Sequence, residues 1–135
     1  MLKLNKRNRT NRGASLIEMV TGAMFFIPIA LVATDLISLS MVEQVNDHIA
    51  RDAARAAANY DKQSDAQAAA QKAVDKYKTN VLITKVQIVE FQFKDGAVHV
   101  KTSIDARVPA PVVGFSGKTL IAQSFQPIVG IPADL

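Results

Sequence analysis

An uncharged run of 16 residues, from Met19 to Thr34, constrains this chain of 135 residues more than any other feature. Apolar residues resume after Asp35 and continue to Val42, so the apolar segment covers residues 16–42. As a helix, the uncharged run would be about 24 Å long and the whole segment about 39 Å, compared with roughly 30 Å for the hydrocarbon core of a bilayer. The sequence therefore predicts a membrane-spanning helix, with Glu18 or Asp35 close to an interface.

All of the excess positive charge lies in front of this segment. The chain has a net charge of +4, yet from Ala14 onward it holds 11 basic and 12 acidic residues, a net charge of −1. Short basic segments stay on the cytoplasmic side of a membrane, so residues 1–13 are expected in the cytoplasm and residues 43–135 outside it. Because the folded part has no basic excess, no nucleic-acid partner is expected. The membrane-orienting residues are Lys3, Lys6, Arg7, Arg9 and Arg12.

Residues that could carry catalysis or bind a metal are sparse. The chain has no cysteine, which excludes disulfides, thiolate nucleophiles and cysteine-ligated metals. The two histidines, His48 and His99, have no ligand-like spacing and are expected to be solvated side chains rather than zinc ligands. We therefore expect no enzyme activity, no catalytic residue, no metal and no cofactor.

The helix is expected to continue beyond the apolar segment to about residue 60. Pro28 removes one amide donor, which predicts either a kink or local unwinding, or else a proline that a membrane helix tolerates. Ser64 and Gln67 form a capping-box pattern that predicts a second helix over residues 65–78, whose alanine-rich face should pack against a sheet. A narrow apolar stripe marks the end of the first helix: Val45, Ile49, Ala53, Ala56 and Tyr60.

Two β-rich runs, over residues 81–93 and 97–108, flank the dipeptide Asp95-Gly96, which is a strong hairpin signal. A two-residue turn there places Glu90 opposite Lys101 on the solvent face. Because the apolar alternation changes phase after Ile88, we also predict a β-bulge at residues 87–89. The expected pairs on the core face are Phe93 with Val98, Phe91 with Val100, and Val89 with Thr102.

Residues 118–126 can form a third strand, so the predicted fold is α+β, with a three-stranded antiparallel sheet and a second helix. Three parts follow from this pattern. Residues 1–13 form a basic leader, residues 14–60 form the long helix, and residues 61–135 form a C-terminal α+β domain outside the membrane. A domain of that size has a marginal core, so the long helix should supply one of its walls.

The segment Arg12-Gly13-Ala14-Ser15-Leu16-Ile17-Glu18, between a basic leader and a long apolar helix, resembles the processing site of class III prepilins. These belong to the type IV pilin and pseudopilin superfamily. With the alanine-rich continuation over residues 49–58 and the strand-rich end, the chain is most similar to TadE-like minor pilins of the tight-adherence (Tad) system. The resemblance implies that a prepilin peptidase cuts between Gly13 and Ala14, and that Glu18 takes part in assembly.

The same resemblance implies a structural subunit of a bacterial pilus used for adhesion or secretion. Its partners would be other pilin or pseudopilin subunits, the prepilin peptidase, an inner-membrane assembly platform and the lipid bilayer. The protein would first be a single-pass inner-membrane protein and would later become part of an extracellular pilus. Independently, a carboxylate at Glu18 at the start of an apolar helix needs a partner, and cleavage would create an amine at Ala14 one helical turn away.

Two other interpretations remain open. Leu31-Val32-Ala33 is a tolerable signal-peptidase site, which would release a soluble binding or enzymatic domain beginning at Thr34. Alternatively, the chain is a permanently anchored single-pass protein whose outer domain binds a partner. The apolar character beyond Ala33, up to Val42, argues against release at this site.

Overall fold

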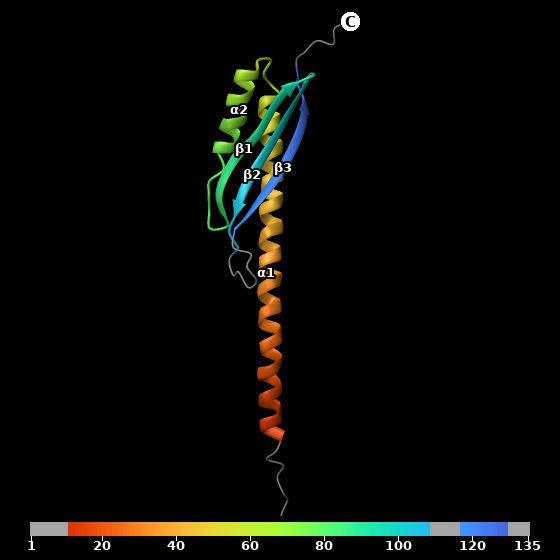
Figure 1. The fold of residues 1–135 in the computed structure, drawn as a ribbon, viewed down its shortest axis with the longest axis vertical. Coiled ribbons are helices and arrows are strands. Elements are labelled where there is room, and N and C mark those ends of the chain that lie inside the picture. Colours follow the sequence, from red (N-terminus) through yellow and green to blue (C-terminus); the bar gives the residue numbers. More distant parts are fainter. Residues whose placement is uncertain (1–10, 109–116, 130–135) are drawn as a thin grey trace, which may run out of the picture.

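In a computed structural model of the chain, residues 11–108 and 117–129 are described. They form helix α1 (Asn11–Ala57), helix α2 (Gln63–Asp75) and strands β1 (Ile83–Lys94), β2 (Ala97–Ala106) and β3 (Lys118–Pro127). The strands make one antiparallel sheet in the order β1-β2-β3 (Figure 1). The α+β fold predicted from the sequence, with a long helix, a second helix and three strands, is confirmed.

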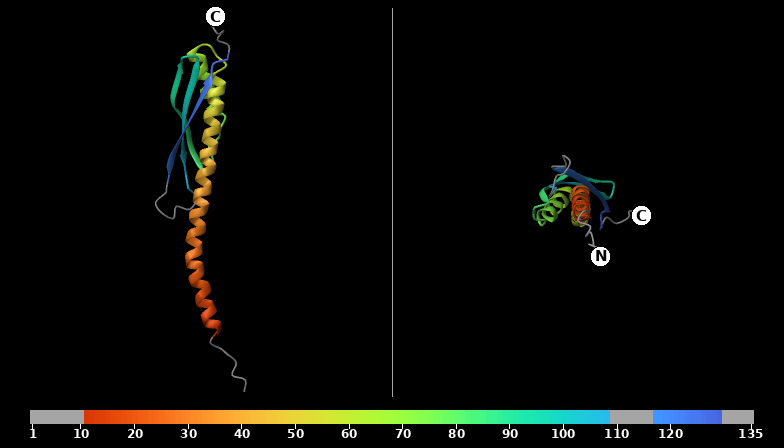
Figure 2. Two further views of the ribbon diagram at one scale, coloured as in Figure 1. Left: turned by 90° about the vertical axis from the view of Figure 1, so that its right-hand side faces the viewer. Right: turned by 90° about the horizontal axis from the view of Figure 1, so that it is seen from below.

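Helix α1 extends far beyond the rest of the fold. The sheet and α2 lie beside its C-terminal half, and its N-terminal half projects alone (Figures 1 and 2). Of the two alternatives for Pro28, the structure has the tolerated proline rather than local unwinding, because α1 continues through this residue without interruption. Figure 2 shows a gentle curve instead. We call residues 42–108 and 117–129 the head, and residues 15–34 the bare segment of α1.

The hairpin between β1 and β2 has the predicted turn. Asp95 and Gly96 have φ angles of 54° and 74°, and a two-residue hairpin turn of type I′ requires positive φ at both positions. The pairs Phe93 with Val98 and Phe91 with Val100 are confirmed. Glu90 lies opposite Lys101, and the two side chains form an ion pair of 2.5 Å.

The predicted bulge is also present, but it changes one predicted pair. The register shifts between Ile88 and Glu90, so Ile88 rather than Val89 pairs with Thr102. Val89 is the extra residue, and it is 53% exposed rather than part of the core. A bulge rotates the strand and thereby returns the apolar side chains before it to the inner face. Val86 and Ile88 consequently pack against the core.

The second helix differs from the prediction at both ends. It begins at Gln63, with Lys62 as an N-cap that makes no side-chain bond, so Ser64 is not a capping residue. The Ser64 hydroxyl instead contacts the neighbouring Asp65 carboxylate. Helix α2 packs mainly against α1, and only weakly against β1, so the expected sheet partner is wrong. Alanine side chains let the two helix backbones approach closely. The buried face of α2 consists of Ala66, Ala70, Ala73 and Val74.

The core lies between α1, α2 and the inner face of the sheet. Ile49 and Ala53 of the predicted stripe are buried, whereas Tyr60 is exposed beyond the end of α1. Buried α1 positions also include residues that the predicted stripe omits, because the helix faces the sheet on one side and α2 on the other. These additional positions are Val42, Asn46, Ala50, Ala54 and Ala57.

Two contacts fix β3 along α1. The side-chain amide of Asn46 donates to the carbonyl of Leu120 at 2.9 Å, and the Thr102 hydroxyl donates to the amide oxygen of Asn46 at 2.8 Å. Beyond the other end of β3, the backbone N–H of Val129 donates to the carbonyl of Ala58 at 2.9 Å. The start of β3 therefore points toward the bare segment of α1.

Candidate functional site

The bare segment of α1 is the most unusual surface of the molecule. By length and composition, α1 is the one helix in the described part of the chain that can cross a membrane. A long apolar helix near the N-terminus is compatible with a membrane anchor. Its large exposed apolar side chains are Leu16, Ile17, Met19, Val20, Met24, Phe25, Phe26, Ile27, Ile29 and Leu31.

Three hydroxyl side chains in and next to the bare segment are satisfied within the helix itself. The hydroxyls of Thr21, Thr34 and Ser38 donate to the carbonyls four residues earlier, at 2.8, 2.9 and 2.9 Å. Such back-bonding satisfies these three hydroxyl donors without water, which suits a helix in an apolar medium. The surface presented to the surroundings is therefore almost entirely apolar.

Asp35 marks the boundary between the bare segment and the head. It is only 5% exposed and it interacts within the chain. Val42, two turns later, is the first residue of the continuous core on α1. The apolar surface and the head therefore meet within about two helical turns, with no flexible linker between them.

The predicted processing segment lies at the beginning of α1. The helix begins at Asn11, so Arg12, Gly13 and Ala14 are helical rather than extended. A Cβ atom added at Gly13 would meet nothing within 4 Å, so packing in the described part of the chain does not require glycine there. Glu18, one turn further on, is exposed. The predicted sites Lys3, Lys6, Arg7 and Arg9 lie outside the described residues.

A helical start does not prevent access to this segment. The first four N–H groups of a helix have no partner within the helix, so unwinding the first turn breaks few hydrogen bonds. Gly13 lies in that turn, where it also lowers the helix propensity by about 1 kcal/mol relative to alanine. A peptidase could therefore extend residues 11–14 without disturbing the head.

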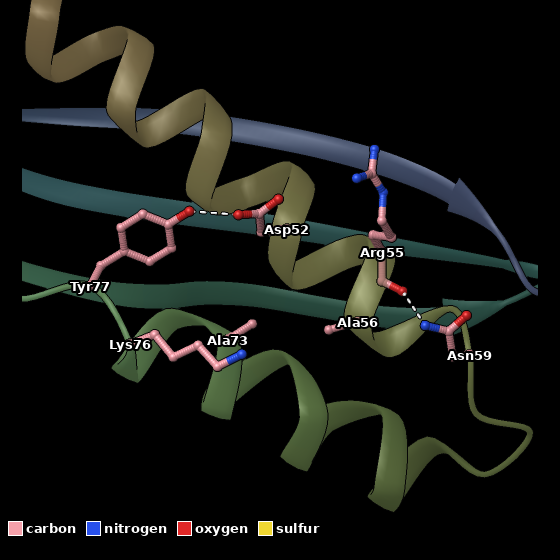
Figure 3. Close-up of a pocket in the computed structure, with 7 residues that line it drawn as sticks. All are labelled: Asp52, Arg55, Ala56, Asn59, Ala73, Lys76 and Tyr77. Carbon is pink, nitrogen blue, oxygen red and sulfur yellow. Dashed lines mark hydrogen bonds between the residues drawn. The ribbon is translucent and has the colours of Figure 1, made fainter.

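A second candidate site is an open cavity of about 450 Å³ between α1 and the end of α2. Figure 3 shows its lining. The Tyr77 hydroxyl donates to the Asp52 carboxylate at 2.5 Å, and the Asn59 amide donates to the Arg55 carbonyl at 3.2 Å. The hydrogen bond to Asp52 raises the pKa of Tyr77, and burial adds to this effect.

The lining of this cavity does not form the arrangement that nucleophilic catalysis needs. The Asp52–Tyr77 bond joins α1 to the segment after α2, which is a structural role. Nucleophilic catalysis needs a nucleophile within hydrogen-bond reach of a base that a third group orients, and the lining of this cavity contains no such set. Among the described residues, no group of three or more His, Asp or Glu side chains could hold a metal ion.

The outer face of the sheet contains a feature that the sequence prediction missed. His99, predicted to be solvated, is half-buried and stacks on Phe125 with ring centroids 4.1 Å apart. Its Nε2 atom is buried without a hydrogen-bond partner in the described part of the chain. The second histidine, His48, is exposed as predicted. Nearby, the hydrogen bond from Lys101 lowers the pKa of Glu90.

Comparisons with protein-family models, with curated proteins and with solved structures found no match for this chain.

Proposed function

We propose that this chain is a pilin-like structural subunit, of the kind of a TadE-like minor pilin or pseudopilin, that is stored in a membrane and then assembled into or primes a pilus. One observation carries the proposal: α1 is a single helix whose C-terminal half is a wall of the head and whose N-terminal part is bare and apolar. The head and the bare segment therefore form one rigid unit. The head suits water, whereas the bare segment suits apolar surroundings.

The bare segment cannot remain in water. Burial of one large apolar side chain contributes about 1.5–3 kcal/mol, so the ten exposed side chains of this segment correspond to something on the order of 20 kcal/mol. Lipid and a bundle of similar helices satisfy this requirement about equally, because lipid tails are as apolar as leucine side chains. A subunit of this shape can move from a bilayer into a helical assembly without exposing its apolar surface to water.

In this proposal, Glu18 makes the contact between subunits specific. A carboxylate on an apolar helix finds a cationic partner when water is removed, and the nearest one in the mature chain would be the amine of Ala14, on the same subunit or on a neighbour. The partners are other pilin-like subunits, the prepilin peptidase and the assembly platform of an inner membrane.

Two alternative functions remain. If the chain is a permanent anchor, Gly13 and Glu18 have no such function. In the alternative of secretion, Leu36, Ile37 and Met41 remain exposed on the released domain.

The intact mass of the mature protein tests the proposal. A chain that begins at Ala14 is the expected result. A chain that begins at Thr34 would instead support secretion, and an intact chain from Met1 would support a plain anchor. Either of these two results would contradict the proposed function.

Replacing Glu18 with alanine should leave cleavage intact and reduce incorporation into filaments by at least about tenfold, which corresponds to the loss of one charge-assisted contact of about 1.5–3 kcal/mol. The measurement is the ratio of filament to membrane-bound protein by immunoblot. Glu43→Ala is the matched control, because Glu43 is an exposed glutamate on the same helix but within the head. Equal incorporation of the two variants would show that Glu18 has no role in assembly and is only a glutamate at the membrane interface.

A further inference from the structure

The end of the sheet that points toward the bare segment carries one cation from each strand region. Lys85 lies near the start of β1, Arg107 follows the end of β2, and Lys118 begins β3. The strand register places them together, since Lys85 pairs with Asp105, and Lys118 pairs with Ala106. All three side chains are exposed. We call these residues, with Val81, the basal rim of the head.

Val81 adds an apolar group at the same end. It precedes Leu82, whose carbonyl accepts the backbone N–H of Arg107 at 2.8 Å. Its side chain is 83% exposed, a larger fraction than for any other large apolar residue in the described head. An exposed valine at the same end of the sheet as exposed cations combines the two features by which proteins bind the interfacial region of a bilayer. In Figure 1 the loop between α2 and β1 lies at this lower end of the sheet.

The acidic groups near the basal rim do not cancel its charge. Asp105 accepts a hydrogen bond from the Thr119 hydroxyl at 2.7 Å. Glu43 of α1 is exposed, and it lies at about the same level along the helix as the basal rim. A cavity of about 520 Å³ opens among Thr84, Asp105, Arg107, Gly117, Lys118 and Thr119. Two of the rim cations, Arg107 and Lys118, line this opening together with one acid, Asp105, and the opening is large enough for a phosphate group.

The position of the basal rim along α1 follows from the contact between Asn46 and Leu120. Asp35 is 11 residues before Asn46, or about 16 Å along the helix. Lys118 lies two residues before Leu120, which brings it about 7 Å closer to the level of Asp35. If the hydrocarbon core ends near Asp35, the headgroup layer extends about 5–7 Å further. Long Lys and Arg side chains span the remaining distance.

We propose that the basal rim binds the phosphate groups of anionic phospholipids and thereby seats the head directly on the membrane surface. This inference rests on the proposed insertion of α1 into a bilayer. The cations approach the phosphates, Val81 enters the interfacial layer, and the rigid junction of α1 with the head holds both at that depth. The lipid surface is therefore a partner of the stored subunit, and it must be released before assembly.

A single introduced cysteine makes the docking measurable, because the chain has none of its own. Thr79 is exposed and lies two residues before Val81, so Thr79→Cys carries a fluorophore close to the basal rim. The full chain is reconstituted in vesicles of phosphatidylcholine, with or without phosphatidylglycerol, that contain a headgroup nitroxide lipid as quencher. We expect strong quenching only with phosphatidylglycerol, and a loss of quenching as ionic strength rises. A label at Gln67→Cys, in the first half of α2, should remain unquenched.

The double variant Lys85→Glu/Arg107→Glu should shift the ratio of docked to undocked heads by at least about 30-fold, because each cation near an anionic surface contributes to binding. Lys118 already interacts within the chain, so it is left unchanged. The matched control is Lys62→Glu/Lys94→Glu, which makes the same charge change at the opposite end of the head and should quench normally.

Two results would overturn the proposal independently of any variant: equal quenching in both lipid mixtures, or quenching that does not respond to ionic strength. Equal loss of quenching in both double variants would show that docking depends only on the net charge of the head. This result would also overturn the proposal. Flotation of the vesicles after an alkaline wash reports insertion separately. Protein that washes off both mixtures would contradict the proposed membrane function as well, whereas retained protein without docking would contradict the basal rim alone.

Discussion

Replacing Asn46 with leucine is expected to destabilise the head by about 2–5 kcal/mol. Asn46 is 1% exposed, and its amide group bonds the Leu120 carbonyl and the Thr102 hydroxyl. Leucine would leave the buried Thr102 hydroxyl and the partly buried Leu120 carbonyl without this hydrogen-bond partner, and each unsatisfied group costs about 1–3 kcal/mol. Urea unfolding of the full chain in detergent, followed by protection from proteolysis, measures the change.

The neighbouring Gln44→Leu is the matched control, because Gln44 is exposed on the same helix and should change stability by less than about 0.5 kcal/mol. The double variant Asn46→Leu/Thr102→Val should be less destabilised than the sum of its single variants, because it removes a donor together with its acceptor. Additive effects would show that the Asn46–Thr102 bond does not couple α1 to β2.

Replacing Gly13 with leucine is expected to abolish processing, so that the precursor, still carrying residues 1–13, accumulates in the membrane. Apart from its chain neighbours and the backbone of its own helix, a Cβ at this position would meet nothing within 4 Å, so the fold tolerates the substitution. Any loss of processing therefore reports recognition by the peptidase rather than misfolding. The measurement is the mass of the membrane-bound protein in cells that contain the peptidase, compared with cells that lack it.

Gly22 provides the control for this experiment. It also lies on α1, and a Cβ there would likewise meet nothing within 4 Å. Gly22→Leu should be processed like the unmodified chain. Normal processing of Gly13→Leu, or an equal loss in both variants, would argue against a cut between Gly13 and Ala14.

Local signals in the sequence predicted the hairpin correctly. Asp95-Gly96 specifies a turn with positive φ at both positions, and the change of apolar phase after Ile88 located the bulge. The pairing of Val89 with Thr102 was nevertheless wrong. A phase change shows that one residue is extra, but it does not show which of the neighbouring residues leaves the ladder.

Tertiary contacts account for the remaining differences. Ser64 fits a capping box, but α2 begins before it, because packing of alanines on α1 sets the helix ends. The sequence analysis did not single out Asn46, since nothing local shows that a strand 74 residues later offers a carbonyl to its side chain. His99 was expected in water, and only the fold places Phe125 against it. The bare apolar segment, by contrast, follows directly from composition.

The two ties between α1 and the β3 region also determine how the molecule responds to mechanical tension. A force applied to the N-terminal end of α1 is transmitted to the β3 region through the hydrogen bond of Asn46 and, 12 residues later, through that of Ala58. Because β3 extends alongside the helix between these points, such a pull loads the hydrogen bonds and the packed alanines in shear. Many contacts then resist together rather than one after another, so the head should stay folded under axial force and yield more readily to a sideways pull that peels β3 from α1.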